Sequence, residues 1–135
     1  MIYPLDTNTC IRHLNQRSSS VTERLRELPE NEIALCSVVR AELYYGAMKS
    51  RHPEQTLLKQ RAFVDRFHSF PFDDDAALVY GRIRAELERV GQTIGANDLM
   101  IAAIALLHNL TLVTHNVREF ERIPALTVED WQGED

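Results

Sequence analysis

The sequence predicts an α/β fold in which a parallel sheet is covered by helices on both faces. Short apolar runs alternate with stretches of helical periodicity along the whole chain. These runs are continuously apolar, as is typical of strands that are buried on both sides. The stretch over residues 98–108 is apolar all round, which indicates a central helix.

The first elements follow from local signals. Residues 2–5 form a short apolar run in which Pro4 gives up a ladder hydrogen bond, so either the strand is brief or position 4 lies where no donor is needed. A helix is expected over residues 7–15. A second helix follows the capping serines at 18–20 and ends at Pro29.

The middle of the chain repeats this alternation. Residues 32–36 predict a buried strand, and Ser37 is expected to cap the next helix, which runs toward a break at Pro53. A helix over residues 54–68 and a short strand over residues 70–72 complete this part.

The last elements begin with three consecutive acids, Asp73–Asp75. We interpret them as the cap and first turn of a helix that runs to Val90 and ends at Gly91, because acids favour a helix N-terminus. After the apolar helix, strands are expected over residues 110–114 and 126–128, with a helical turn over residues 117–122 between them.

Length and composition are those of one globular domain over residues 1–135. The chain is 44% hydrophobic and 26% charged, which excludes wholesale disorder, and no apolar run is long enough for a membrane span. The acid at position six argues against a signal peptide. Two cysteines, Cys10 and Cys36, are too few for a disulfide scaffold, so we expect free buried thiols and a cytoplasmic protein.

The net charge of −5 restricts how this chain could bind nucleic acid. Residues 1–68 hold ten basic and eight acidic residues, whereas residues 69–135 hold five basic and twelve acidic residues. A protein that binds nucleic acid through bulk charge is basic. Binding by this chain therefore requires bridging cations or a local basic face, for which the candidates are Arg12, Arg40, Lys49, Arg51, Arg82 and Arg84.

Polar residues follow the predicted strands. Asp6 ends the first strand, Glu42 lies in the helix after the second, Asp98 begins the apolar helix, and Asn116 follows the 110–114 strand. Ligands of parallel sheets bind beyond the carboxyl ends of the strands, so these side chains could share one crevice. Carboxylates that converge repel one another, and a hard divalent cation such as Mg²⁺ is the usual reason to tolerate this.

Each of these residues also has a purely structural interpretation. Asp6 could cap the following helix, and Glu42 could be solvated like most mid-helix glutamates. Asp98 could be an acid that the helix dipole stabilises at the N-terminus, and Asn116 could be a turn residue.

Five segments carry a more specific signal. Together they resemble the motifs of PIN-domain ribonucleases, and most closely the VapC toxins of bacterial toxin–antitoxin pairs, in order and over essentially the whole chain. The segments are residues 5–8 (LDTN), 37–47 (SVVRAELYYGA), 94–103 (IGANDLMIAA), 113–120 (VTHNVREF) and 123–131 (IPALTVEDW).

The resemblance implies a five-stranded parallel sheet of order 3-2-1-4-5 and an endoribonuclease that depends on Mg²⁺, with Mn²⁺ as a substitute. Asp6, Glu42 and Asp98 match the acidic metal site of the family. Asn116 stands where many PIN domains have aspartate, and Glu119, one helical turn later, is expected to supply the carboxylate. The polar residues that match positions around this site are Thr7, Asn8 and Thr114.

The family also implies a mechanism and partners. We expect in-line hydrolysis that leaves a 5′-phosphate and a 3′-hydroxyl. The substrate would be a structured RNA, and the resemblance favours the anticodon stem-loop of initiator tRNA. Cleavage of this RNA would inhibit translation. A cognate VapB-type antitoxin would neutralise the toxin by placing a basic side chain in the acidic crevice, and the toxin itself would be a homodimer.

Other protein classes fit less well. A receiver-type phosphoacceptor domain needs an acidic pair near the first strand and a late lysine, and a dehalogenase-type phosphatase needs Asp-x-Asp. Thr7 and Asn8 occupy those positions here, and no lysine follows Lys59. A catalytically weak PIN scaffold that only binds RNA or a partner remains an alternative, because Asn116 is an amide.

Overall fold

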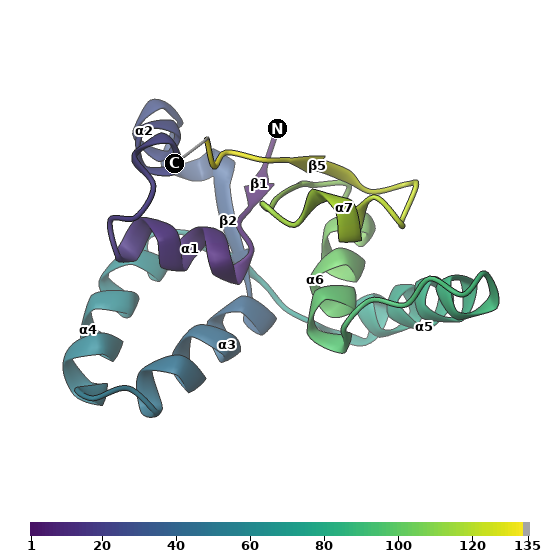
Figure 1. The fold of residues 1–135 in the computed structure, drawn as a ribbon, viewed down its shortest axis with the longest axis horizontal. Coiled ribbons are helices and arrows are strands. Elements are labelled where there is room, and N and C mark those ends of the chain that lie inside the picture. Colours follow the sequence, from purple (N-terminus) through teal and green to yellow (C-terminus); the bar gives the residue numbers. More distant parts are fainter. Residues whose placement is uncertain (134–135) are drawn as a thin grey trace.

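The computed structural model describes residues 1–133 and contains two parallel sheets flanked by helices (Figure 1). The first sheet has the order β1-β2-β3, with β1 at Tyr3–Pro4, β2 at Ile33–Cys36 and β3 at His68–Phe70. The second sheet pairs β4 (Thr111–Val113) with β5 (Thr127–Glu129). The predicted α/β class with parallel strands is confirmed.

The two sheets meet at a narrow seam. One isolated parallel bridge joins Leu5 to Val113, and the Asp6 amide donates to the Val113 carbonyl at 3.0 Å. The predicted single five-stranded sheet of order 3-2-1-4-5 is therefore not present as one continuous ladder. The Thr111 amide donates to the Ile2 carbonyl, and in a regular parallel ladder the next donor would be the amide of residue 4, which proline lacks.

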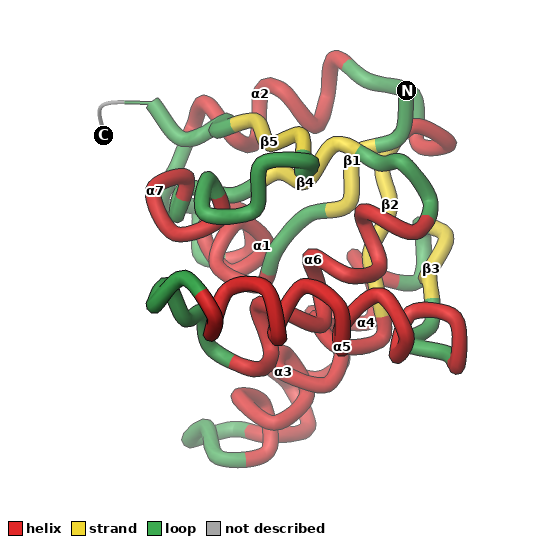
Figure 2. The backbone as a smooth tube through the Cα atoms, turned by 90° about the vertical axis from the view of Figure 1, so that its right-hand side faces the viewer, coloured by secondary structure: helices red, strands yellow, loops and turns green. Residues whose placement is uncertain are grey.

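Helices cover both sheets, and the hairpin of α3 and α4 lies at the end of the molecule opposite α2 (Figure 2). Helix α5 packs along α6, and α3 contacts both α1 and α6. The helical elements are α1 (Thr7–Leu14), α2 (Ser19–Glu27), the 3₁₀ turn η1 (Glu30–Glu32), α3 (Ser37–Met48), α4 (Pro53–Val64), α5 (Asp74–Arg89), α6 (Ala96–Leu107) and α7 (Val117–Phe120).

Most predicted elements are present, and several differ in their bounds. Helix α4 ends at Val64 rather than at residue 68, and β3 starts at His68 rather than at residue 70, where the strand had been expected. Pro71 cannot donate to a ladder, so the pairing with β2 uses the residues before it. Helix α6 begins two residues early, at Ala96.

The capping signals were interpreted correctly at two helices. Ser18 caps α2 by accepting from the Val21 amide, and Asp73 caps α5 by accepting from the Ala76 amide at 3.0 Å. At α3 the cap position is Cys36, not Ser37, and no side chain caps that helix. The three consecutive aspartates are therefore explained by helix capping.

Helix α6 lies in the core, as its composition predicts. Leu99 and residues 101–105 are buried. Both cysteines are buried and free, which also agrees with the prediction. Within residues 1–133, no helix is long and apolar enough to cross a membrane.

Candidate active site

Asp6 is held at the seam between the two sheets. It lies two residues after the end of β1 and is only 6% exposed. Its Oδ1 accepts a hydrogen bond from the Thr9 amide at 2.9 Å, which caps α1. The capping interpretation of Asp6 is thus correct, and it leaves the second carboxylate oxygen for other interactions.

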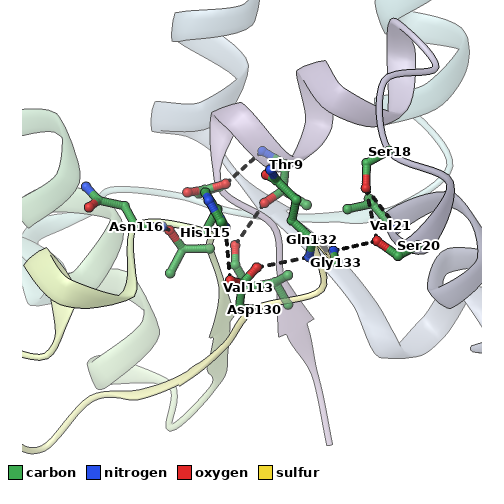
Figure 3. Close-up of polar contacts among 12 residues, drawn as sticks. Thr9, Ser18, Ser20, Val21, Val113, His115, Asn116, Asp130, Gln132 and Gly133 are labelled. Carbon is green, nitrogen blue, oxygen red and sulfur yellow. Dashed lines mark hydrogen bonds and ion pairs between the residues drawn. The ribbon is translucent and has the colours of Figure 1, made fainter. Parts of the chain in front are cut away.

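The surroundings of Asp6 favour its protonated form. Burial is the largest effect and raises the pKa of the carboxyl, while hydrogen bonds from Thr114 and Thr9 lower it and the charge of Glu42 raises it further. Thr114 is fully buried at the end of β4, and its Oγ1 accepts from the Asn116 amide at 3.0 Å. Thr9 reaches across the seam to the Val113 carbonyl at 3.5 Å (Figure 3).

Glu42 is fixed by two side chains from other helices. The Thr7 hydroxyl donates to its Oε1 at 2.6 Å, and the Asn97 amide donates to its Oε2 at 3.3 Å. Glu42 is partly buried, so the interpretation as a freely solvated mid-helix glutamate was wrong. Asn97 was not singled out from the sequence, although its position directly before Asp98 is a usable signal.

Asp98 lies in the first turn of α6 and is surrounded by like charges. Its pKa is raised from 3.8 to about 6, first by burial and then by the charges of Glu119, Glu42 and Asp6. Asp98 thus lies within electrostatic reach of Glu119 in α7, Glu42 in α3 and Asp6 at the N-cap of α1. The helix dipole that favours a charge at this position does not cancel their repulsion.

Asn116 and Glu119 form one unit. The Asn116 amide donates to Glu119 Oε2 at 2.7 Å, and Glu119 Oε1 accepts from the Gly95 amide at 3.4 Å. Because Gly95 is the N-cap of α6, this contact brings Glu119 to the first turn of α6, where its charge raises the pKa of Asp98. Asn8 is exposed and lines the same cavity as Asp6 and Asn116.

The oxygen-rich surroundings suit a hard divalent cation. Among residues 1–133, no three acidic, histidine or cysteine side chains already converge closely enough to hold an ion. The charges of Asp6, Glu42 and Glu119 nevertheless raise the pKa of the Asp98 carboxyl, and the charge of Glu42 raises that of Asp6. Small side-chain movements toward a cation would relieve their repulsion.

Two cavities flank these carboxylates. One, of about 630 Å³, includes Asp6, Arg12, Arg17 and Asn116 among its lining residues. The other, of about 680 Å³, includes Glu42 and lies along α3.

The structure separates the candidate phosphate contacts. Arg12 and Lys49 line the two cavities beside the carboxylates. Arg40 instead bonds to Asp65 and the Val64 carbonyl, and Arg84 bonds to Glu88 and Tyr80, so both are engaged within the fold.

Comparison with known proteins places these features in context. The family model of the PIN domain matches residues 3–126. The chain is 45% identical over 132 residues to ribonuclease VapC2 of Rickettsia felis, and the match covers 97% of this chain and 98% of that protein. It is 42% identical over 129 residues to the tRNA(fMet)-specific endonuclease VapC of Salmonella typhimurium, and the match covers 96% of this chain and 97% of that protein.

A solved structure agrees with this similarity. The crystal structure of VapBC2 from Rickettsia felis, bound to a DNA fragment from their promoter, contains a chain that superposes with a TM-score of 0.91. The identity is 44%, and the match covers 98% of this chain and 100% of that one.

Proposed function

The chain belongs to the PIN-domain family and to its VapC ribonuclease branch, and on that premise we propose that it is a Mg²⁺-dependent endoribonuclease toxin. The whole of residues 1–135 would form one PIN domain. The observation that carries the proposal is the gathering of Asp6, Glu42 and Asp98 from three distant segments, with the pKa of Asp98 raised to about 6.

Asp6, Glu42 and Asp98 would hold the metal ion, and Glu119, oriented by Asn116, would complete the acidic set. When bound, Mg²⁺, or Mn²⁺ in its place, supplies Lewis-acid stabilisation of the charge that develops on the phosphodiester. Carboxylate oxygens are the ligands that such ions prefer.

The remaining residues keep these carboxylates in position. Thr7 and Asn97 orient the two oxygens of Glu42, while hydrogen bonds from Thr9 and Thr114 to Asp6 partly offset the effect of burial, which raises the pKa of that carboxyl. In the reaction, water attacks the phosphorus and the bond to the 3′-oxygen breaks. The products are a 5′-phosphate on one fragment and a 3′-hydroxyl on the other.

The substrate we propose is tRNA, and specifically the anticodon stem-loop of initiator tRNA, whose cleavage would inhibit translation in the cytoplasm. The Salmonella typhimurium relative, named a tRNA(fMet)-specific endonuclease, supports this choice. Arg12 and Arg17, on the Asp6 side of the site, would contact phosphates of the RNA.

The partner we propose is a VapB-type antitoxin, because similar chains occur in VapBC complexes. The toxin would form a homodimer and bind the antitoxin as a hetero-oligomer. A basic antitoxin side chain in the acidic crevice would compete with the metal ion.

A cleavage assay tests the enzymatic proposal. Purified protein is incubated with total tRNA and ribosomal RNA in Mg²⁺, beside an EDTA control and the Asp98→Ala variant, and new 5′ ends are mapped. Asp75→Ala serves as a matched control, since Asp75 is also an acid in the first turn of a helix. We expect one discrete cut that bears a 5′-phosphate and is lost in EDTA and in Asp98→Ala only.

If the wild type and Asp98→Ala behave alike on every RNA, the catalytic proposal fails. The chain would then be a PIN scaffold that binds RNA or a partner without cleaving it.

A further inference from the structure

A groove extends from the candidate active site along α3. It is the cavity of about 680 Å³, and three of its lining residues, Thr7, Glu42 and Asn97, are the hydrogen-bonded set described above. The groove thus reaches the Glu42 carboxylate and the residues that orient it. We refer to it as the α3 groove, and its other lining residues are Ser37, Val38, Ala41, Tyr45, Gly46, Lys49 and Met100.

The side of α3 that carries Glu42 also carries the candidate ligand contacts of the α3 groove. Residues three and four positions after Glu42, Tyr45 and Gly46, share its side of the helix, and the C-cap residue Lys49 follows seven positions after it. Going outward from the carboxylate, this face presents an aromatic ring, a position with no side chain, and a cation.

Gly46 is not explained by the fold. Glycine inside a helix costs about 1 kcal/mol relative to alanine. A Cβ at this position would meet no atom within 4 Å, and its φ is not in the left-handed region. The backbone neither requires glycine here nor needs the space for packing, so the effect of Gly46 is to keep the α3 groove open for a close approach.

Tyr45 and Lys49 form a pair that suits a nucleotide. The Tyr45 side chain is 66% exposed, and Lys49 Nζ lies 4.7 Å from the centre of its ring. Within residues 1–133, Lys49 makes no ion pair with a carboxylate. An exposed aromatic ring is a stacking surface for any base, and a nearby ammonium group attracts phosphate.

We propose that the α3 groove binds an unpaired nucleotide of the RNA next to the scissile phosphodiester. Its base stacks on Tyr45, its backbone passes over Gly46, and its phosphate contacts Lys49. This inference rests on the proposed nuclease function and adds to it the residues that receive the strand on one side of the cut.

The position of the groove favours RNA over a peptide as its occupant. An endonuclease cuts inside a strand, so the chain of nucleotides must leave the metal site in two directions. Asp6 lines one cavity together with Arg12 and Arg17, and Glu42 lines the other together with Lys49, so each cavity holds positive charge in a chain whose net charge is −5. A strand that enters by one cavity and leaves by the other passes over Asp6 and Glu42.

The test uses two readouts, so that the groove and the nuclease can fail separately. The first is kcat and KM for Mg²⁺-dependent cleavage of total tRNA. The second is the affinity of total tRNA for the same variants carrying Asp98→Ala, which requires no cleavage. Gly81 in α5 provides a matched control for Gly46, because a Cβ there also meets no atom within 4 Å, and Lys59 in α4 provides one for Lys49.

Gly46→Leu should lower kcat/KM and the affinity by tenfold or more, whereas Gly81→Leu should change neither. Gly46→Ala should raise Tm and still weaken cleavage, which a merely structural role would not produce. Tyr45→Ala should cost about fivefold to a hundredfold, mainly in KM, and Tyr45→Phe should restore most of the loss. Lys49→Ala should reduce the slope of log affinity against log salt by about 0.7, and Lys59→Ala should leave it unchanged.

Several outcomes would overturn the proposal. If the wild type cleaves tRNA and Gly46→Leu cleaves it equally well, the α3 groove does not receive the strand. If Gly46→Leu prevents co-purification of the antitoxin but leaves tRNA affinity intact, the groove belongs to a peptide. If the wild type cleaves nothing but the affinity falls as described, the groove assignment stands and the nuclease proposal fails.

Discussion

Asp98→Asn should stabilise the metal-free protein while abolishing its activity. The Asp98 carboxylate is partly buried among Glu119, Glu42 and Asp6, and these surroundings raise its pKa from 3.8 to about 6. At neutral pH the folded protein therefore holds a charge that its own structure disfavours. Asparagine has the same shape without the charge.

The size of the effect follows from the pKa. One pKa unit corresponds to 1.36 kcal/mol, so the change from 3.8 to about 6 gives an upper limit of about 3 kcal/mol. Asp98 is partly exposed, and solvent screening reduces this to about 1.5 kcal/mol. Loss of a favourable charge in the first turn of α6 costs about 0.5 kcal/mol. The expected net gain is about 1 kcal/mol, or about 3–5 °C in Tm.

The dependence on pH has a definite sign. Because the folded pKa is raised, the folded state binds more protons than the unfolded state between pH 3.8 and about 6. The charge penalty is absent below pH 3.8, grows as the pH rises and is complete above about 6. The advantage of Asp98→Asn should therefore be present at pH 7 and vanish near pH 4.

Thermal melts of both proteins in EDTA at pH 4 and pH 7 measure this difference, and Asp75→Asn reports the helix-dipole loss alone. Addition of Mg²⁺ should raise the Tm of the wild type more than that of Asp98→Asn. If Asp98→Asn is no more stable than the wild type at pH 7 in EDTA, the carboxylates do not repel one another as described.

Three further substitutions test other contacts. Glu42→Gln keeps the acceptor for Thr7 but removes a charge, so cleavage should fall by about a hundredfold or more with little change in Tm; full turnover would exclude Glu42 from the metal site. Asn116→Asp places a second charge against Glu119, so the protein should lose about 1 kcal/mol in EDTA and bind Mn²⁺ more tightly by calorimetry; unchanged affinity would contradict this. Arg40→Ala removes the hydrogen bond from Arg40 in α3 to the Val64 carbonyl, so the free energy of unfolding, measured by urea denaturation, should fall by about 1–2 kcal/mol. The cleavage rate per folded molecule should be unchanged, and a lower rate would show that Arg40 does more than make this hydrogen bond.

The sequence predicts the elements well because their signals are local. Ser18 and Asp73 cap helices as expected, and the all-apolar composition of α6 correctly places it in the core. The misplaced bounds of α4 and β3 depend on pairing with β2, which is a tertiary contact and leaves no signal in residues 64–70 themselves.

The gathering of Asp6, Glu42 and Asp98 could also be expected from the sequence, because parallel strands and their following helices direct residues to one edge. The partners of these carboxylates could not. Whether Glu42 bonds to Thr7 and Asn97, and whether Asn116 turns toward Glu119, depends on side-chain rotamers and on the distance between helices. For the same reason the sequence did not identify Tyr45 and Gly46 as the lining of a groove.

The short strand β1 accounts for the placement of Asp6. Because Pro4 has no amide to donate, the two sheets are joined by the Leu5–Val113 bridge and by the hydrogen bonds from the Thr111 amide to Ile2 and from the Asp6 amide to Val113. Asp6 therefore lies where the two sheets separate. It follows β1 in the first sheet and caps α1, and its carboxylate accepts a hydrogen bond from Thr114, which follows β4 in the second sheet. Glu42 reaches the same place from the helix after β2, and Glu119 from the helix after β4. A continuous ladder would fill this seam with backbone hydrogen bonds, whereas the narrow bridge leaves its carboxyl end open for the carboxylates to meet.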